Sequence, residues 1–192
     1  MVLYADGTAS ATDLSPPPAR VSNSANSAIV FAPPTLYHPD RFELRGGVFA
    51  HAVGSPEEGS ADLNFELVAP RFFTIPNLPD FLTPRFHVGG MVNLDGQTSY
   101  SYAGALWTIN LTQNWFAEGF FGGIVHNGKH NDETGQMNDL GCSWAFHSGG
   151  SLGYRLNARW SVMATFDHLS NAELCQYNKG VNDWGLRLGY TL

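Results

Sequence analysis

The sequence predicts an all-β protein, an eight-stranded antiparallel up-and-down transmembrane β-barrel, from three observations. Apolar and polar residues alternate through eight segments between residue 41 and the end of the chain, as expected for strands with one apolar and one polar face. Glycine is frequent, with 21 residues, and aromatic residues make up 13% of the chain. Most segments are about ten residues long, the length with which a tilted strand crosses a bilayer.

The composition supports a membrane barrel and excludes several other classes. Charged residues make up only 14% of the 192 residues, which is low for a soluble globular domain. The net charge of −7 argues against a nucleic-acid partner, because such a partner requires a basic face. No apolar run reaches the ~18 residues that a membrane-spanning helix needs.

Three regions follow one another along the chain. Residues 1–11 end in small residues and are interpreted as the remnant of a secretory signal, the alternative being a plain small-residue tail. Residues 12–40 are rich in Pro, Ser and Asn and are expected to form an N-terminal arm. Residues 41–192 are expected to form the barrel.

The first four segments each set an apolar row against polar residues of the opposite parity. The apolar rows are Phe42, Leu44, Val48 and Ala50; Leu63, Phe65 and Leu67; Phe86, Val88, Val92 and Leu94; and Ala103, Ala105, Trp107, Ile109 and Leu111. The opposite parity carries Glu43, Arg45, Glu66 and His87.

The last four segments repeat the pattern. Their apolar rows are Trp115, Ala117, Phe121 and Val125; Phe146, Leu152, Tyr154 and Leu156; Trp160, Val162, Ala164 and Phe166; and Trp184, Leu186, Leu188, Tyr190 and Leu192. The opposite parity carries Glu118, His147, Arg155, Asp167, Asp183 and Arg187. In a membrane barrel the apolar rows face lipid, and the charged side chains fill a lumen that eight strands make narrow enough to pack.

A soluble lipocalin-like barrel, with the apolar rows facing inward, is the structural alternative. Against it, the apolar strand end at 189–192 resembles the last strand of outer-membrane barrels. Short turns also alternate with long loops, at 126–141 and 171–179, as in such barrels. The long proline-rich segment 72–85 breaks this alternation, and the sequence offers no physical explanation for it.

The two cysteines, Cys142 and Cys175, fall at neighbouring strand ends on the predicted outer rim. In a secreted protein this placement predicts a disulfide, and two free thiols are the alternative. The histidines and acidic residues of 126–133 are interpreted as a solvated loop rather than a metal site. We therefore expect no metal and no cofactor.

His168 and Ser170 are the candidate reactive residues. They lie two positions apart at the end of the seventh segment, so on a strand both point to the same side. A base beside a hydroxyl is the arrangement that activates a nucleophile. By parity both continue the lipid-facing row that contains Phe166. The alternative explanation for these two polar residues is that the strand simply leaves the hydrocarbon of the membrane at this point.

The run 168–172, followed by Asn178, Gly180 and the closing strand, resembles the outer-membrane lipid A 3-O-deacylase family, the PagL-like acyloxyacyl hydrolases. The resemblance covers about the last quarter of the chain. It implies an integral bacterial outer-membrane protein that contacts lipopolysaccharide and membrane lipids. It also implies a serine esterase that removes an ester-linked 3-hydroxyacyl chain from lipid A. His168 would be the base, Ser170 the nucleophile, and Asn178 or a nearby backbone N–H the oxyanion donor. The alternative is a catalytically weak or inactive barrel with a structural or surface-interaction role.

The sequence departs from the family pattern at the residue that orients the base. The pattern has a glutamate fourteen residues after the histidine, and here that position is Asn182. An asparagine can hold the imidazole but offers no negative charge, and a change from Asp to Asn in a serine protease slows the reaction by ~10⁴.

Two acidic residues near Asn182 are the alternatives for this role. Strand parity places Asp183 in the lumen with Arg187, unless a bulge near Gly180 turns it outward. Glu173 could take the role if its loop folds back toward the histidine.

Overall fold

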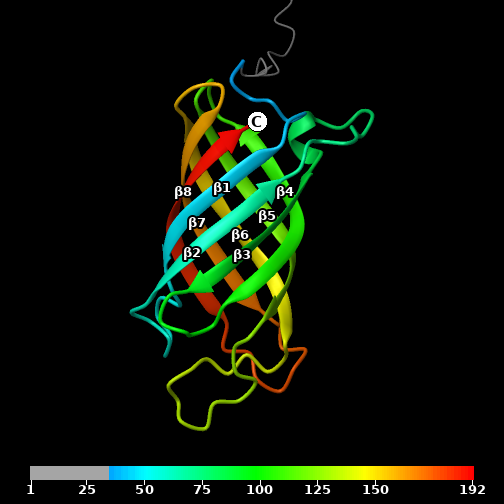
Figure 1. Ribbon diagram of the computed structural model, residues 1–192. Helices are drawn as coiled ribbons and strands as arrows, with labels where there is room; N and C mark the ends of the chain where they lie inside the picture. Colours follow the sequence, from blue (N-terminus) through cyan, green and yellow to red (C-terminus); the bar gives the residue numbers. More distant parts are fainter. Residues whose placement is uncertain (1–34) are drawn as a thin grey trace, which may run out of the picture. The chain divides into compact units, whose positions relative to one another are not determined.

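The computed structural model describes residues 35–192, whose eight antiparallel strands close into a barrel (Figure 1). Each strand pairs with its sequence neighbours, and β8 pairs with β1. The strands are β1 (Glu43–Ala50), β2 (Ala61–Val68), β3 (Arg85–Asn93), β4 (Tyr100–Asn110), β5 (Trp115–His126), β6 (Trp144–Arg155), β7 (Trp160–Ser170) and β8 (Val181–Thr191). The predicted fold class is thus confirmed.

The barrel has two unlike ends. One end, here called the turn end, carries the short connections 111–114 and 156–159 and the longer segment 69–84, which includes the 3-10 helix η1 (Asp80–Leu82). The opposite end, here called the loop end, carries the connections 51–60, 94–99, 127–143 and 171–180 (Figure 1). Among the described residues, no helix is long and apolar enough to cross a membrane.

The expected signal remnant at 1–11 and most of the expected arm at 12–40 lie outside the described residues. The last part of the arm, from residue 35, lies against the turn end. There the Thr35 N–H donates to Gln113 Oε1 at 3.0 Å, and the Tyr37 ring lies 4.9 Å from the Arg155 guanidinium carbon. This segment covers lumen residues at the turn end.

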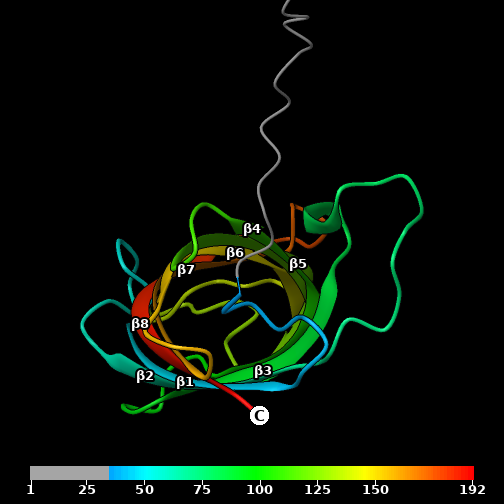
Figure 2. The ribbon, with the colours of Figure 1, turned by 90° about the horizontal axis from the view of Figure 1, so that it is seen from above.

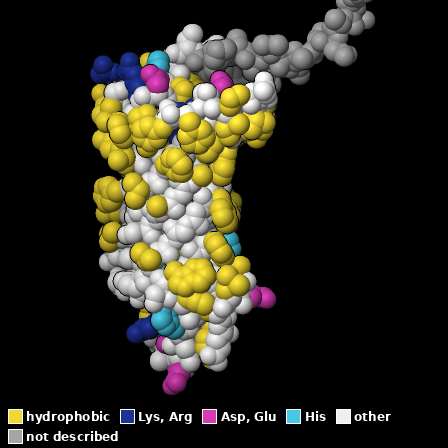
Figure 3. All heavy atoms as spheres, turned by 90° about the vertical axis from the view of Figure 1, so that its right-hand side faces the viewer, with side chains coloured by type: hydrophobic (Ala, Val, Ile, Leu, Met, Phe, Trp, Pro, Cys, Tyr) yellow, Lys and Arg dark blue, Asp and Glu magenta, His cyan; other side chains and the backbone are white. Residues whose placement is uncertain are grey.

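The alternation of side chains sorts the wall from the lumen as predicted. On the outer wall Phe65, Phe121 and Leu188 are exposed, and Trp107 and Phe166 are half-buried on the same face. The buried charged side chains include Glu43, Glu66, Glu118, Asp167 and Arg187. Figure 3 shows one face of the wall, where the exposed charged side chains gather toward the two ends. This arrangement suits lipid outside and a polar packed interior.

Opposite charges pair throughout the lumen. Arg45 on β1 binds Glu118 on β5 at 2.8 Å, Glu43 at 2.9 Å and Glu66 at 3.2 Å. Buried charges are tolerated only when they are paired and hydrogen-bonded. The lumen is therefore a packed core that joins strands distant in sequence.

One expected pair in the lumen is wrong. Asp183 does face the lumen, but Arg187 binds Asp167 at 3.3 Å and Asn64 at 2.8 Å instead. Asp183 accepts hydrogen bonds from the Ala52 N–H and from the Tyr100 hydroxyl. Parity fixes which face a side chain takes, whereas the pairing across the lumen depends on how the closed barrel staggers its strands.

Candidate functional site

The β7 and β8 register places His168 directly opposite Asn182 on the outer wall near the loop end. Asp167 and Leu169, the flanking residues of opposite parity, are buried to 0% and 1% exposure. His168 and Ser170 therefore both face outward, each half-buried. The lipid-facing row thus ends in an imidazole and a hydroxyl.

The imidazole of His168 is held by an amide. Its Nδ1 lies 2.7 Å from Asn182 Oδ1, and because that oxygen can only accept, Nδ1 is the donor. The neutral ring then has its proton on Nδ1, and Nε2 is left with a free lone pair. Nε2 is the atom that a general base uses to take a proton.

Gly180 allows β8 to approach this histidine closely. A Cβ at residue 180 would lie 2.5 Å from the Leu169 carbonyl oxygen and 3.3 Å from His168 Cε1. The first distance is a clash with backbone, which cannot move aside as a flexible side chain could. The absence of a side chain at residue 180 is therefore part of the packing around His168.

Ser170 forms its hydrogen bonds with the loop that follows it rather than with His168. Its Oγ donates to Asn178 Oδ1 at 3.1 Å and accepts from the Ala172 N–H at 3.1 Å. No hydrogen bond joins Ser170 to His168 within residues 35–192. Ala172 and Glu173 have φ of 54° and 63°, and such left-handed residues turn the chain back over the hydroxyl.

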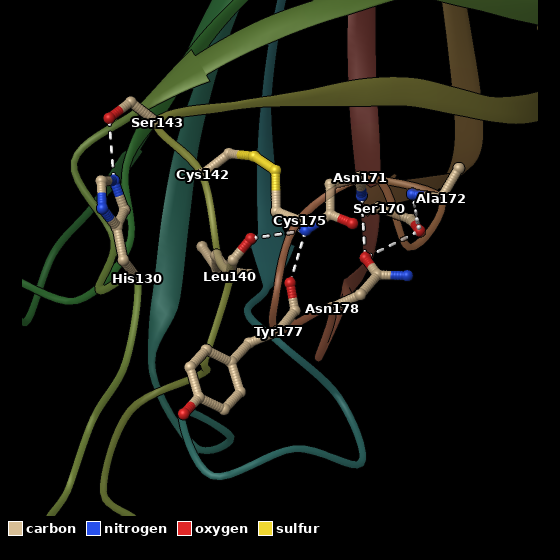
Figure 4. Close-up of a disulfide and its surroundings, with 10 residues drawn as sticks. All are labelled: His130, Leu140, Cys142, Ser143, Ser170, Asn171, Ala172, Cys175, Tyr177 and Asn178. Atoms are coloured by element: carbon tan, nitrogen blue, oxygen red, sulfur yellow. Dashed lines mark hydrogen bonds between the residues drawn. A yellow bond between two sulfur atoms is a disulfide. The ribbon is translucent and has the colours of Figure 1, made fainter.

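Asn178 has a fixed amide orientation. The Asn171 N–H donates to its Oδ1 at 2.8 Å, so the carbonyl end faces the strand and the Nδ2 end points away from that N–H (Figure 4). The Ala172 N–H and the Asn178 amide group both belong to the β7–β8 loop, and both lie beside the Ser170 hydroxyl. Both are groups that could donate to an oxygen bound beside Ser170.

Asn171 and a disulfide anchor the loop that carries Asn178. The side chain of Asn171 is buried, and its Nδ2 donates to the Leu140 and Tyr177 carbonyls. Cys142 and Cys175 form the predicted disulfide, with Cα atoms 6.0 Å apart (Figure 4). The bridge joins the 127–143 and 171–180 connections at the loop end, so both are tied to the end of β7.

The two acidic alternatives to Asn182 do not reach the histidine. Asp183 lies in the lumen, fully buried, on the other side of the wall. Glu173 is exposed, and within the described part of the chain it has no hydrogen bond to His168. Asn182 is the residue that the structure brings to the ring.

Sequence reasoning missed a buried cluster under the loop end. His51 binds Asp62 through Nδ1 at 2.8 Å and Glu57 through Nε2 at 3.0 Å, and Asp183 lies 3.5 Å from Nδ1. The ligand-type atoms of His51, Asp62 and Asp183 lie within 4.8 Å of one another. The two acids also accept from protein donors, Asn93 Nδ2 for Asp62 and Tyr100 for Asp183. Internal hydrogen bonds thus explain the cluster. Its only sequence signal was a histidine in line with the lumen row of β1.

Glu57 links three of the loop-end connections. Besides His51, it accepts from the Thr98 N–H, from the Thr98 hydroxyl and from the Asn138 N–H, at 2.8–3.0 Å. Burial would raise the pKa of Glu57, but these donors outweigh it and lower the pKa to about 2. Burial would likewise lower the pKa of His51, yet hydrogen bonds to Asp62 and Glu57 raise it to about 9.

Within the 127–143 connection, the Asp132 carboxylate accepts hydrogen bonds from residues that follow it closely in sequence. That carboxylate accepts from the Thr134 hydroxyl at 2.8 Å and from the Gln136 and Met137 N–H groups at 2.7 Å. These hydrogen bonds, led by the one from Met137, lower the pKa of Asp132. The carboxylate thus caps its own turn.

A family model matches the chain, and solved structures are similar to it in fold. A family model for lipid A 3-O-deacylase (PagL) matches residues 82–191. No curated protein sequence matches the chain. The crystal structure of the outer membrane enzyme PagL is similar, with 18% identity and a TM-score of 0.60, over 77% of this chain and 97% of that one.

Other barrels are similar in fold. A designed transmembrane β-barrel has 10% identity and a TM-score of 0.53, over 81% of this chain and 98% of the other. The N-terminal barrel domain of Pseudomonas aeruginosa OprF has 12% identity and the same TM-score, over 80% and 98%. The outward-facing His168, Ser170 and Asn182 lie within the range that the family model matches.

Proposed function

Because this chain belongs to the lipid A 3-O-deacylase (PagL) family, an outer-membrane family, we propose that it hydrolyses an ester-linked 3-hydroxyacyl chain of lipid A at His168 and Ser170. The observation that supports this site is the 2.7 Å hydrogen bond from His168 Nδ1 to Asn182. This hydrogen bond fixes the His168 ring on the outer wall and leaves Nε2 free. The Ser170 hydroxyl, two residues along the strand, faces the same way. A substrate held in the membrane meets the protein on that wall.

The reaction begins with a rotation of Ser170. Its hydroxyl must leave Asn178 Oδ1 and turn to His168 Nε2, which takes the proton as Oγ attacks the ester carbonyl. Hydrogen bonds of this kind often form only once substrate is bound. The Ala172 N–H already points at Oγ, and with Asn178 Nδ2 it is the donor we assign to the developing oxyanion.

The remaining steps return the enzyme to its starting state. The imidazolium of His168 gives its proton to the departing sugar alkoxide, and the carbonyl re-forms as an acyl ester on Ser170. A water then loses a proton to His168 and attacks that ester, and the 3-hydroxy fatty acid leaves as Ser170 regains its proton.

Mass spectrometry of lipid A incubated with the purified protein in detergent tests this proposal. Wild-type protein should release a 3-hydroxy fatty acid, and both Ser170→Ala and His168→Ala should abolish the release. Ser148 offers a matched control, because it faces His168 across β6 and β7 on the same wall. Ser148→Ala should keep the activity, and loss there with retention in Ser170→Ala would refute the assignment.

Two observations favour a second interpretation, a catalytically weak or inactive barrel with a surface-interaction role. His168 is paired with a neutral amide, and the Ser170 hydroxyl is engaged by Asn178. If wild-type protein and Ser170→Ala leave lipid A equally intact, this second interpretation replaces the first.

A further inference from the structure

The 69–84 segment between β2 and β3, here called the turn-end loop, displays an unusual group of apolar side chains. Six of them are exposed by 38–68%: Phe72, Phe73, Ile75, Leu78, Phe81 and Leu82. Exposed apolar side chains gathered in this way mark a surface that contacts something other than water. The loop is also the long segment that breaks the alternation of short turns and long loops.

The turn-end loop is continuous with the lipid-facing wall. The indole N–H of Trp107 on β4 donates to the Leu82 carbonyl at 3.2 Å, and the Phe73 ring lies 6.4 Å from that of Phe86 on β3. Figures 1 and 2 show the loop extending sideways from β3 and β4, level with the strand ends, rather than onward along the barrel axis. Its apolar side chains thus extend the wall outward at one end.

A shallow hollow lies on the wall beside the loop. It has a volume of about 510 Å³, and its lining includes Ala69, Phe86, Val88, Ala103 and Ala105. The small side chains and the neighbouring Gly104 leave room there for a flexible apolar chain.

The composition of the loop suits the boundary between hydrocarbon and water. The sequence places prolines at 70, 76, 79 and 84, and each proline removes a backbone N–H that would need a partner away from water. The two charged side chains differ in exposure: that of Asp80 is 85% exposed, whereas that of Arg71 is 8% exposed. The two groups lie 3.9 Å apart as an ion pair, so the covered guanidinium has a partner in a carboxylate that stays open to water.

We propose that the turn-end loop inserts its apolar side chains among the glycerophospholipids of the periplasmic leaflet of the outer membrane. The short turns of outer-membrane barrels face the periplasm, which places this end of the barrel at that leaflet. The occupant follows from continuity, because the loop packs on Trp107 and Phe86, which belong to the wall that lipid already covers. A fluid leaflet accepts a protruding loop without a matching groove, whereas a second protein copy would need one.

The position of the loop gives the insertion a consequence for the barrel. The turn-end loop and His168 lie at opposite ends of the barrel, because the loop joins β2 to β3 at the turn end and His168 lies near the loop end of β7. An anchor at the turn end resists tilting of the barrel, and tilt sets the depth of His168 in the outer leaflet.

Environment-sensitive labelling tests the insertion. Phe81→Cys would carry an NBD fluorophore, with the native disulfide intact, in vesicles of phosphatidylethanolamine and phosphatidylglycerol. Val88→Cys on the wall and Gln136→Cys at the loop end give lipid and water references, because both positions are exposed. Folding of each variant is checked by its shift on unheated gels.

The proposal predicts a blue-shifted emission at residue 81, close to that at residue 88. A lipid nitroxide near the headgroup should quench residue 81 more strongly than one near the end of the acyl chain. Emission like that at residue 136, with no quenching, would place the loop in water and overturn the proposal. A blue shift without quenching by either lipid would also overturn it, since protein rather than lipid would then cover the loop.

Discussion

His168 and Asn182 are joined across β7 and β8 by a hydrogen bond of 2.7 Å between Nδ1 and Oδ1. The amide selects the tautomer and holds the ring, as a carboxylate would. It does not supply the negative charge that stabilises an imidazolium once the proton has moved. In the proposed reaction, the His168 ring is therefore oriented, but one electrostatic contribution to proton transfer is missing.

Asn182→Glu should raise the rate of lipid A deacylation. A carboxylate at this place would keep the hydrogen bond and add the missing charge, with a gain of up to ~10⁴, the size of the loss in the reverse change in a serine protease. Asn182→Ala should lower the rate, because the ring loses its orienting partner. The measurement is the initial rate of fatty-acid release for the three proteins at equal folded concentration.

Asp183→Asn is the matched control for that experiment. Its side chain is buried in the lumen with Ala52 and Tyr100, so we expect an unchanged rate and a lower unfolding temperature. An active Asp183→Asn supports Asn182 as the orienting residue. If Asp183→Asn is folded but inactive and Asn182→Glu is no faster than the wild type, Asn182 is not the orienting residue.

Gly180→Ala should reduce activity more than stability. The new Cβ would meet the Leu169 carbonyl at 2.5 Å, so the start of β8 must move away from His168. Displacements near 1 Å at a catalytic group cost on the order of 10²-fold in rate. Gly119→Ala, whose Cβ would meet no atom within 4 Å, should keep the wild-type rate. Equal rates for both variants would contradict the close packing at residue 180.

Loss of the disulfide should destabilise the loop end. The bridge joins residues 33 apart in sequence, and native disulfides contribute typically about 2–4 kcal/mol. The double variant Cys142→Ser and Cys175→Ser should lose that much in denaturant unfolding from vesicles. Reduction of the wild type should reproduce the loss, and reductant should leave the variant unchanged. A wild type that is equally stable before and after reduction would count against a stabilising bridge.

The loop-end cluster should make stability depend on pH at both extremes. The pKa of His51 is raised from 6.5 to about 9, so its contribution is full below pH 6.5 and is lost as the pH rises through 9. The pKa of Glu57 is lowered from 4.5 to about 2, so its contribution is full above pH 4.5 and is lost as the pH falls toward 2. Both contributions are complete between pH 4.5 and 6.5.

Denaturant midpoints measured across this range test the dependence. His51→Gln should remove the loss of stability at high pH, although Asp62, Asp183 and Glu57 still face residue 51. Glu57→Gln should remove the loss of stability at low pH. Glu58→Gln is the control, since Glu58 accepts from the exposed Gly54 N–H outside the cluster. Identical profiles for the wild type and His51→Gln would contradict the assignment to His51.

The period of two residues made the walls of this barrel predictable. Each side chain on a strand takes its face from its parity, which also placed His168 and Asn182 on the same face. Features that do not follow from strand parity could not be predicted from the sequence. Glu57 lies in a connection without periodicity, and the Ser170 hydroxyl is directed by the left-handed turn at 172–173. The pairing of Arg187 with Asp167 could not be predicted either, because it joins positions four residues out of register on β7 and β8, and parity does not specify that offset.

The outward direction of His168 and Ser170 also determines how substrate and protein would meet. A lipid that reaches a site on the barrel wall travels by lateral diffusion in two dimensions, so bulk concentration does not govern the encounter. The governing quantity is the mole fraction of lipid A in the surrounding membrane or micelle. Diluting that surface with inert detergent would slow turnover even when the amounts of protein and lipid A per volume stay the same.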